Sequence, residues 1–499
     1  MKWSTVAAAL VPVASAALGF TKEEYDSGAV MAWMMEQKES AWAKQRAAGA
    51  YDSKKWSGFD KHRPDKDRVR CINGKAIAKA NDTDQHYKCK DIDLYDFKSH
   101  VELGSPLGEG SGSWGWEYWG REFYILGQTD GAAFVEIKDG KLVYLGRLPA
   151  QANPVIWREI KVAGNYVVIG SEGVGHNIQF FDLRKLLKIN PKEPKTFNTG
   201  SDLTSLFTNL PVGRSHNVVV NEEKNYAVAV GAAPRNSSCA GGLIFINIDD
   251  ITKPYSPGCA PQDGYVHDAQ CIVYRGPHAK YYGRDICYGY NEDTLTIYDV
   301  TNKNGPNAST IISRTPYKGA SYSHQGWIIN PYWQTHLVLD DELDEGELYN
   351  GTRTNPESPA KDGFPVTYIF DITNLEKPTQ SGQYKSKVRS VDHNQFIYDG
   401  LLYQSNYQAG LRVLDVSSIP WAPSGKYVNE IAYFDVYPGD DDLPGGGAAV
   451  WEGGTWSHYT FKSGWIAINT IDRGVFLVRL NKFKGRGFGK RQLRGMERK

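Results

Sequence analysis

Ile369-Phe-Asp-Ile372 is one copy of a short pattern that recurs along the chain and decides its fold. Each copy has two apolar residues, a polar residue and another apolar residue, and a second strand-like run precedes it. Short apolar runs separated by turn residues are typical of β-strands. The seven copies begin at Phe134, Phe180, Phe245, Ile297, Ile369, Val413 and Leu477. The chain therefore contains seven similar units built from strands.

A third strand precedes these two in each unit, and several units show a fourth. Examples of the fourth strand are Leu142–Leu145, Thr310–Ile312 and Glu430–Tyr433. Four short strands at a spacing of roughly 45–70 residues predict the blades of a β-propeller. Inserted loops, notably 184–212 and 343–365, explain the long spacing. Seven blades close most simply into one ring; a solenoid is the alternative, but solenoid repeats are normally shorter.

The last unit ends after its third strand, so one strand is missing. The run from Ile92 to Val101 precedes the first unit and has the pattern of a strand. Pairing this closing strand, within 90–103, with the last unit removes an exposed sheet edge and locks the ring. We therefore expect an all-β, seven-bladed β-propeller over residues 65–481.

Residues 20–64 predict a helical extension and a linker ahead of the propeller. Thr21 and Glu24 form a capping-box pattern, and apolar residues at helical spacing follow it. These apolar residues are Val30, Met31, Met34 and Trp42. We expect one helix over about 21–48 that packs on the propeller. The basic tail 482–499 is typical of a solvated, frayed end, with contact to an acidic glycan or phosphate as the alternative.

The composition excludes several classes of protein. A length of 499 residues exceeds what a single hydrophobic core usually supports and fits a modular array of small cores. Lys+Arg and Asp+Glu both number 57, which excludes a chain-wide electrostatic grip on nucleic acid or an anionic membrane. The sequence after the N-terminal segment has no apolar run long enough to span a membrane, so we expect no membrane span.

Residues 1–19 have the pattern of a secretory signal peptide. Lys2 is a short positive region, residues 6–13 are apolar, and Ala14-Ser15-Ala16 is a cleavage pattern of small residues. Four N-x-[S/T] glycosylation patterns follow, at Asn81, Asn236, Asn307 and Asn350. Together these features predict a secreted, extracellular glycoprotein.

Six cysteines agree with an oxidising compartment. Six cysteines allow 15 pairings, and we favour nearest neighbours because each pair flanks one local loop. The expected disulfides are Cys71–Cys89, Cys239–Cys259 and Cys271–Cys287. Zinc is the alternative, but the sequence has no Cys-x-x-Cys and no histidine at zinc-finger spacing.

Histidine occupies one position in four units when they are aligned on the start of the innermost strand. These residues are His216, His267, His324 and His393. The second unit has Arg158 at this position, and the seventh has Ser457 followed by His458. Innermost strands line the axis of a propeller, so these side chains should converge at one mouth of the channel. The alternative is that each histidine binds the backbone of the neighbouring blade.

A metal site is one chemistry that suits such a face. Several imidazoles on one ring can hold a transition metal, and Asp268 with Asp392 can hold Ca²⁺ or another divalent cation near the propeller axis. The alternative is a hydrogen-bonded network with water in the channel.

β-Elimination on a uronic acid is a second chemistry, and the reaction requires no cofactor. It needs donors at the carboxylate, a base near neutrality and a proton donor for the leaving oxygen. Arg158 and Arg214 are candidate carboxylate clamps, and Arg473 could extend that site. The remaining candidates are the bases His216, His267 and His324, the acid Tyr407, the substrate-binding Glu172, His393 and Asn394, and the sugar-stacking Trp114, Trp116 and Trp157. Packing inside the blades is the alternative for the tryptophans.

Two other classes compete with a lyase. A pair of carboxylates would suit glycoside hydrolysis, and the candidates are Glu172, Glu292, Asp341 and Asp268. A propeller can also bind a glycan or a cell wall without catalysis. Ser-His-Asp hydrolysis is disfavoured because no G-x-S-x-G elbow occurs and the strands do not alternate with helices.

Six stretches resemble the secreted choice-of-anchor B proteins with LVIVD-type propeller repeats, a likeness that covers about 65–480. They are Ser113–Trp116, Gly264–Gln270, Tyr322–Trp327, Leu339–Glu345, Asp392–Asn394 and Gln404–Arg412. The chain is also similar to fungal rhamnose–glucuronate lyases, secreted seven-bladed propellers that remove terminal L-rhamnose from D-glucuronate on arabinogalactans such as gum arabic by β-elimination. This resemblance implies an active site at the channel mouth and a uronic-acid-containing polysaccharide as substrate. We expect the protein to be a monomer.

Overall fold

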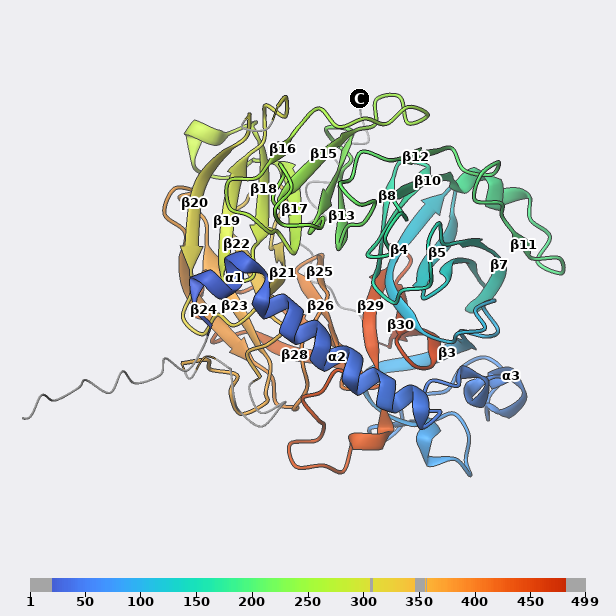
Figure 1. The fold of residues 1–499 in the computed structure, drawn as a ribbon. Coiled ribbons are helices and arrows are strands. Elements are labelled where there is room, and N and C mark those ends of the chain that lie inside the picture. The colour runs from blue at the N-terminus through green and yellow to red at the C-terminus, as the bar shows by residue number, and fades with distance from the viewer. Residues whose placement is uncertain (1–19, 306–307, 346–354, 356, 482–499) are drawn as a thin grey trace, which may run out of the picture.

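Seven β-sheets stand around a common axis in the computed structural model (Figure 1). The structure describes residues 20–305, 308–345, 355 and 357–481. The first strands of successive sheets are neighbours around the ring, so they are the innermost strands. The predicted seven-bladed propeller with N-terminal helices is therefore confirmed. Four features expected from the sequence lie outside the described residues: the signal peptide 1–19, the sequons at Asn307 and Asn350, and the tail 482–499.

The first three blades follow one another in the chain, except that β11 returns from blade 2 to the edge of blade 1. Blade 1 contains β4 (Gly110–Tyr118), β5 (Arg121–Gln128), β6 (Gly131–Lys138), β7 (Lys141–Pro149) and β11 (Lys195–Thr196). Blade 2 contains β8 (Arg158–Ala163), β9 (Tyr166–Ser171), β10 (Ile178–Asp182) and β12 (Ser205–Phe207). Blade 3 contains β13 (Asn217–Asn221), β14 (Tyr226–Val230), β15 (Leu243–Asn247) and β16 (Cys259–Ala260). The segment 184–212, expected as an inserted loop, therefore adds one strand to each of two blades.

The next three blades have the same order of strands. Blade 4 contains β17 (Asp268–Val273), β18 (Asp285–Tyr290), β19 (Thr294–Asp299) and β20 (Thr310–Pro316). Blade 5 contains β21 (Ser323–Ile328), β22 (His336–Asp341), β23 (Val366–Asp371) and β24 (Thr379–Lys385). Blade 6 contains β25 (Gln395–Tyr398), β26 (Leu401–Asn406), β27 (Gly410–Asp415) and β28 (Asn429–Phe434), extended by β2 (His86–Lys90) and β1 (Lys75–Ile77).

Blade 7 joins two distant parts of the chain. It contains β29 (Thr455–Thr460), β30 (Trp465–Thr470), β31 (Gly474–Leu480) and, as its outer strand, β3 (Ile92–Ser99). β3 pairs antiparallel with β31, and Phe97 lies opposite Phe476 with ring centroids 4.6 Å apart. β3 lies within the closing strand predicted over 90–103. The pairing covers the edge of β31 and ties the ring together.

Three disulfides connect the cysteines that are neighbours in sequence, as predicted: Cys71–Cys89, Cys239–Cys259 and Cys271–Cys287. Each joins residues of one local loop or one pair of strands; Cys271 and Cys287 lie opposite each other on β17 and β18. Disulfides persist in oxidising compartments, so these three are compatible with an extracellular protein.

The Cys71–Cys89 disulfide allows a test of this framework. Replacing both cysteines with serine is expected to lower the free energy of unfolding by about 3 kcal/mol, because the bridge closes a loop with a sequence separation of 18 residues. Denaturant unfolding of the oxidised proteins measures the change. In a reducing agent the difference should vanish, and equal unfolding midpoints under oxidising conditions would contradict the prediction.

Two N-terminal helices lie across one face of the ring (Figure 1). The capping box of Thr21 and Glu24 is present at the start of α1 (Lys22–Ser27). The single helix expected over 21–48 is wrong in one respect, because Gly28 has a φ of 82° and separates α1 from α2 (Ala29–Ala47). The left-handed conformation favours glycine and interrupts the helix. As predicted, the helices pack on the propeller: the Trp42 indole N–H donates to the backbone oxygen of Trp451 over 2.7 Å.

The other described helices are short. They are α3 (Phe59–His62), η1 (Ser53–Trp56), η2 (Thr83–Gln85), η3 (Leu183–Lys188), η4 (Ala279–Tyr281) and η5 (Pro438–Asp440). Within the described ranges, no helix combines the length and the apolar character that crossing a bilayer requires. Two predicted glycosylation sites, Asn81 and Asn236, are exposed.

Candidate functional site at the helix-covered channel mouth

Four imidazoles form a row on the face that α2 covers. His216 and His267 stand directly before the innermost strands β13 and β17, and His393 lies two residues before β25. His324 is the second residue of β21. Centroids of neighbouring rings are 4.2 Å apart for His216 and His267, and 4.4 Å apart for each later pair in the row. The structure thus brings together the four histidines that share one position in the sequence repeats.

Two of these imidazoles bind the backbone of the next blade. His267 Nδ1 lies 2.9 Å from the backbone oxygen of His324, and His393 Nδ1 lies 2.7 Å from that of Trp456. This is the structural role that the sequence left open. Since a carbonyl oxygen only accepts, Nδ1 carries the proton in both rings, and the lone pair is on Nε2.

The other two imidazoles are held by carboxylates. His216 Nδ1 lies 2.6 Å from Glu172 Oε1, and His324 Nδ1 lies 3.3 Å from Asp340 Oδ1. The Glu172 carboxylate, whose pKa lies below its usual value, places the proton of His216 on Nδ1 and raises the basicity of Nε2. Burial and nearby acids raise the pKa of Asp340 well above its usual value. All four rings are therefore oriented from outside, with their Nε2 atoms left for other partners.

Burial keeps three of the imidazoles neutral. Loss of solvation, reinforced by neighbouring imidazoles, lowers the pKa of His267 and His324 well below the usual 6.5. Loss of solvation also lowers the pKa of His393 to about 4. Neutral imidazoles can accept protons or bind metals, so the row retains its chemical capacity at neutral pH.

Glu342 is a buried hub beside this row. Its Oε1 atom accepts hydrogen bonds from Lys38 Nζ at 2.6 Å and from the Tyr407 hydroxyl at 2.5 Å. His393 Nε2 lies 3.7 Å from the same oxygen, and His324 Nε2 lies 3.8 Å from Oε2. Burial alone would raise the pKa of Glu342, but Lys38 and the nearby groups hold it below its usual value.

The sequence analysis did not select Lys38 or Glu342 as site residues. Lys38 lies on α2 between Met34 and Trp42, four residues from each, and is therefore on the apolar stripe of the helix. A lysine on the apolar face of a helix indicates a buried partner of opposite charge, because a buried charge needs such a partner. Lys38 meets Glu342 across 304 residues of sequence, which no local pattern indicates.

Glu172, Arg214 and His216 form the part of the row that reaches solvent. The side chain of Arg214 is 29% exposed and that of His216 is 13% exposed, whereas Glu172 is buried. Glu172 Oε2 accepts from an Arg214 amine, and its other oxygen holds His216. Burial would raise the pKa of Glu172, but its hydrogen bonds and opposite charges lower it. A carboxylate therefore orients both a base and a cation.

The two other predicted carboxylate clamps have different partners. Arg158 is buried, and its guanidinium contacts the backbone oxygen of Gln128 at 3.1 Å and His176 Nε2 at 2.7 Å. Arg473 is also buried, pairs with Asp472 and lies over the Trp56 ring at 4.1 Å. Their proposed contact with substrate is corrected: both guanidiniums are used inside the protein.

The three tryptophans predicted to stack on sugars are packing residues. Trp157 lies against Trp42 of α2, with centroids 5.2 Å apart. Trp116 stacks on Tyr118, and Trp114 lies under the Lys161 ammonium. The alternative reading, packing within and between blades, therefore holds for all three.

Several other predicted residues are buried in the hydrogen-bond network. Asn394 Nδ2 donates to the backbone oxygen of Trp456 at 3.0 Å. Tyr407 is fully buried and donates to Glu342, so a direct role as the acid is corrected. Of the candidate hydrolase carboxylates, Glu292 pairs with Arg235 at 2.7 Å. Asp341 accepts hydrogen bonds of 2.7 Å from the backbone amides of Ser321 and Tyr322, just before β21. These carboxylates already have protein partners.

The carboxylates considered for Ca²⁺ lie in different surroundings. Asp268 Oδ1 accepts from the amide of Ala269, and burial raises the Asp268 pKa to about 7. Asp392 lies near Glu345 and is fully buried, and burial with nearby acids raises its pKa well above the usual value. Among the described residues, the two aspartates do not belong to a common group of metal-ligating side chains, so a shared site for them is not supported.

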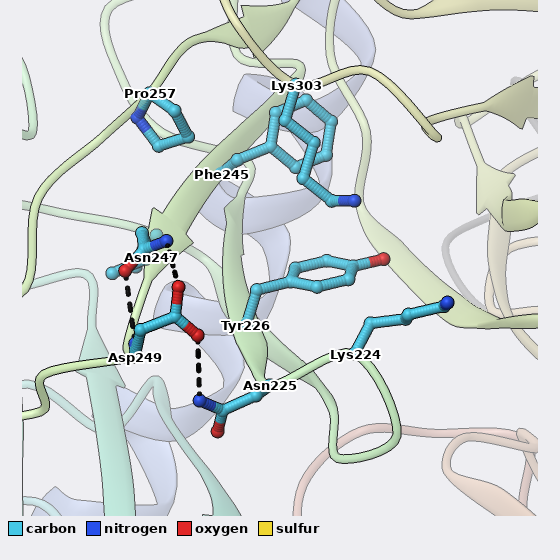
Figure 2. A pocket seen from close by; sticks show the side chains of 9 residues that line it. Lys224, Asn225, Tyr226, Phe245, Asn247, Asp249, Pro257 and Lys303 are labelled. Carbon is cyan, nitrogen blue, oxygen red and sulfur yellow. Dashed lines mark hydrogen bonds between the residues drawn. The ribbon is translucent and has the colours of Figure 1, made fainter.

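A small cavity of about 180 Å³ lies at the opposite ends of the strands (Figure 2). Tyr226, at the start of β14, and Asn247, at the end of β15, line it. Lys303 lies 4.1 Å over the Tyr226 ring and pairs with Asp285 at 2.6 Å. Since the histidine row lies at the other end of β13, this cavity is separate from the candidate site.

No family model and no curated protein sequence matches the chain. The β-propeller domain of Cps50 (Swd1) from Myceliophteria thermophila is 10% identical over 72% of this chain and 93% of that chain, with a TM-score of 0.41. The WD40 β-propeller domain of Doa1 is 9% identical over 78% and 95%, with a TM-score of 0.44. The computationally designed Ika8 protein is 9% identical over 74% and 96%, with a TM-score of 0.41.

Proposed function

We propose that this protein is a secreted polysaccharide lyase that cleaves uronic-acid-containing glycans by β-elimination. The observation that carries the proposal is the Glu172–His216–Arg214 cluster at the solvent-facing end of the histidine row. It combines a base and a carboxylate-binding cation, which are the two groups that the reaction needs first.

Arg214 would bind the carboxylate of the uronic acid. One of its amines is engaged by Glu172, and the exposed part of the guanidinium has further N–H donors. Removing the proton at C5 builds negative charge on this carboxylate, so a cation there stabilises the transition state more than the bound substrate.

His216 would remove the C5 proton through Nε2. Glu172 holds the proton on Nδ1, which leaves the Nε2 lone pair free to act as base. The C5 electron pair forms the C4–C5 double bond, and the C4–O4 bond breaks. In glucuronate, H5 and O4 lie on the same face of the ring, so the His216 imidazolium can return its proton to O4. The products are a free sugar and a 4,5-unsaturated uronate.

The substrate we propose is L-rhamnose linked to O4 of D-glucuronate in arabinogalactan-type glycans. The sequence resemblance to rhamnose–glucuronate lyases supports this choice. The exposed sequons and the three disulfides support a secreted glycoprotein.

Incubation of the secreted protein with gum arabic tests the proposal. We expect ultraviolet absorbance from the unsaturated uronate to rise in step with released rhamnose. Rhamnose without absorbance would indicate a hydrolase instead. Glycan binding without either product would favour the alternative of a non-catalytic binding propeller, and a panel of other uronic-acid glycans would separate a wrong substrate from a wrong reaction.

A further inference from the structure

We propose that His324, His393 and Glu342 form a binding site for one divalent transition-metal ion of the zinc class. The three side chains are buried, come from blades 5 and 6, and can each bring one ligand atom within 4.8 Å of the other two. This site lies farther along the histidine row than the cluster around His216, and it does not depend on the proposed lyase activity.

The distances between the donor atoms suit a small ion. Glu342 Oε2 lies 3.8 Å from His324 Nε2, and Glu342 Oε1 lies 3.7 Å from His393 Nε2. Zinc binds imidazole nitrogen and carboxylate oxygen at about 2.0–2.2 Å, which places neighbouring donors in a tetrahedron about 3.4 Å apart. Small side-chain shifts would therefore close the site around an ion.

The outer contacts are those that metal-binding histidines usually have. His324 Nδ1 faces Asp340 Oδ1, and His393 Nδ1 faces the backbone oxygen of Trp456 at 2.7 Å. Such contacts fix the tautomer in which Nε2 can bind the metal, and they hold the rings in place.

Lys38 occupies part of this site as a cation from the N-terminal helix. Its ammonium lies 2.6 Å from Glu342 Oε1, and its side chain is almost fully buried. A metal ion bound to Glu342 would bind the same carboxylate as the Lys38 ammonium, so the two cations should compete for its negative charge. The arrangement shows that the protein already stabilises one positive charge at this position.

The donor set indicates the class of ion. Two imidazoles and one carboxylate favour zinc, cobalt, copper or nickel over calcium and magnesium, which prefer oxygen ligands. Three protein ligands also leave a fourth position open for water or another molecule. The partly exposed His216, two rings away from His324 in the row, marks the side from which an ion can enter.

Titration of the full-length secreted protein with Co²⁺ and Zn²⁺ tests the site after dialysis against a chelator. We expect one Co²⁺ per chain, with the intense visible absorption bands of a four-coordinate ion that Zn²⁺ abolishes. Equilibrium dialysis with metal analysis gives the stoichiometry. A protein that binds no ion, or only ions with the weak bands of hexa-aqua cobalt, would overturn the proposal without any variant.

Three variants sharpen the test. Glu342→Gln and His393→Gln are expected to weaken Zn²⁺ binding by at least about 10- to 100-fold. Lys38→Leu should tighten it by about 10-fold or more, because the ammonium no longer repels the ion. Zn²⁺ should raise the Tm of this variant because the ion replaces the missing positive charge beside Glu342. The exposed His62 provides a control, since His62→Ala should bind as the wild type does.

Two results with these variants would overturn the assignment of the ion to His324, His393 and Glu342. Binding that survives Glu342→Gln and His393→Gln but falls in His62→Ala would place the ion on the surface and overturn the proposal. Binding by Lys38→Leu alone would also overturn it for the natural protein, because Lys38 would then exclude the ion. Loss of lyase activity plays no part in these readouts.

Discussion

Replacing His216 with alanine is expected to lower kcat for β-elimination by about 10²- to 10⁴-fold, the usual contribution of a general base. The fold should be retained because His216 is the most exposed of the four imidazoles, and its polar contact in the structure is to Glu172. Continuous absorbance at the unsaturated product, measured on variants with unchanged circular dichroism, gives the rate. Added imidazole should restore part of it, which a purely structural role would not produce.

Two further variants separate the roles within the same cluster. Glu172→Gln keeps the size of the side chain but removes its charge, so it should lower kcat less than His216→Ala does. Arg214→Lys should lower kcat as well as raise KM for uronic-acid substrates, because lysine lacks the planar fork that holds the carboxylate in the transition state. Full activity of His216→Ala would show that another residue is the base and would remove the assignment, whereas a His62→Ala control should keep the wild-type rate.

Replacing Trp42 with alanine is expected to lower the free energy of unfolding by about 3–5 kcal/mol, the usual cost of removing a large buried aromatic side chain. Trp42 is fully buried where α2 meets the propeller. Its ring lies 5.2 Å from Trp157 and 6.1 Å from Trp456, and its N–H binds the Trp451 backbone. The variant leaves a cavity and loses the hydrogen bond to the Trp451 backbone oxygen, and denaturant unfolding measures the loss.

Trp119 provides the matched control, because its side chain is 91% exposed. Trp119→Ala should change stability by no more than about 0.5 kcal/mol. Hydrogen exchange adds a local measurement: the amides of α2 should exchange faster in Trp42→Ala than in the wild type. Equal stability of the two variants would mean that α2 contributes little to the fold.

Local patterns predicted most of the fold. The strand repeats are local because each strand needs only its own alternation of apolar residues, and the blades appear in the structure in that order. The sequence predicted the position of the N-terminal helix but not its interruption at Gly28. The apolar pattern from Thr21 to Trp42 is continuous, and the effect of Gly28 depends on its backbone conformation. The segment 184–212 contains strands because parts of its interior lie beside the outer edges of β7 and β10.

The candidate site was predicted less completely. The four histidines occupy one position in the repeat, and this predicted correctly that they lie together. Equivalent backbone positions around a propeller face the same end of the axis. The shared position did not predict the partners of Arg158, whose buried guanidinium contacts Gln128 and His176. The backbone position is common to all blades, but the direction of a flexible side chain depends on its own partners.

The sequence by itself therefore determined the number of blades, the closing strand near Ile92, the disulfide pairs and the row of histidines, since each depends on spacing along the chain. Only the tertiary structure decided that α2 covers this row, that Lys38 meets Glu342, and that Glu172 orients both His216 and Arg214. These contacts join segments far apart in sequence, and their energy comes from burial and charge pairing that exist only after the ring has closed.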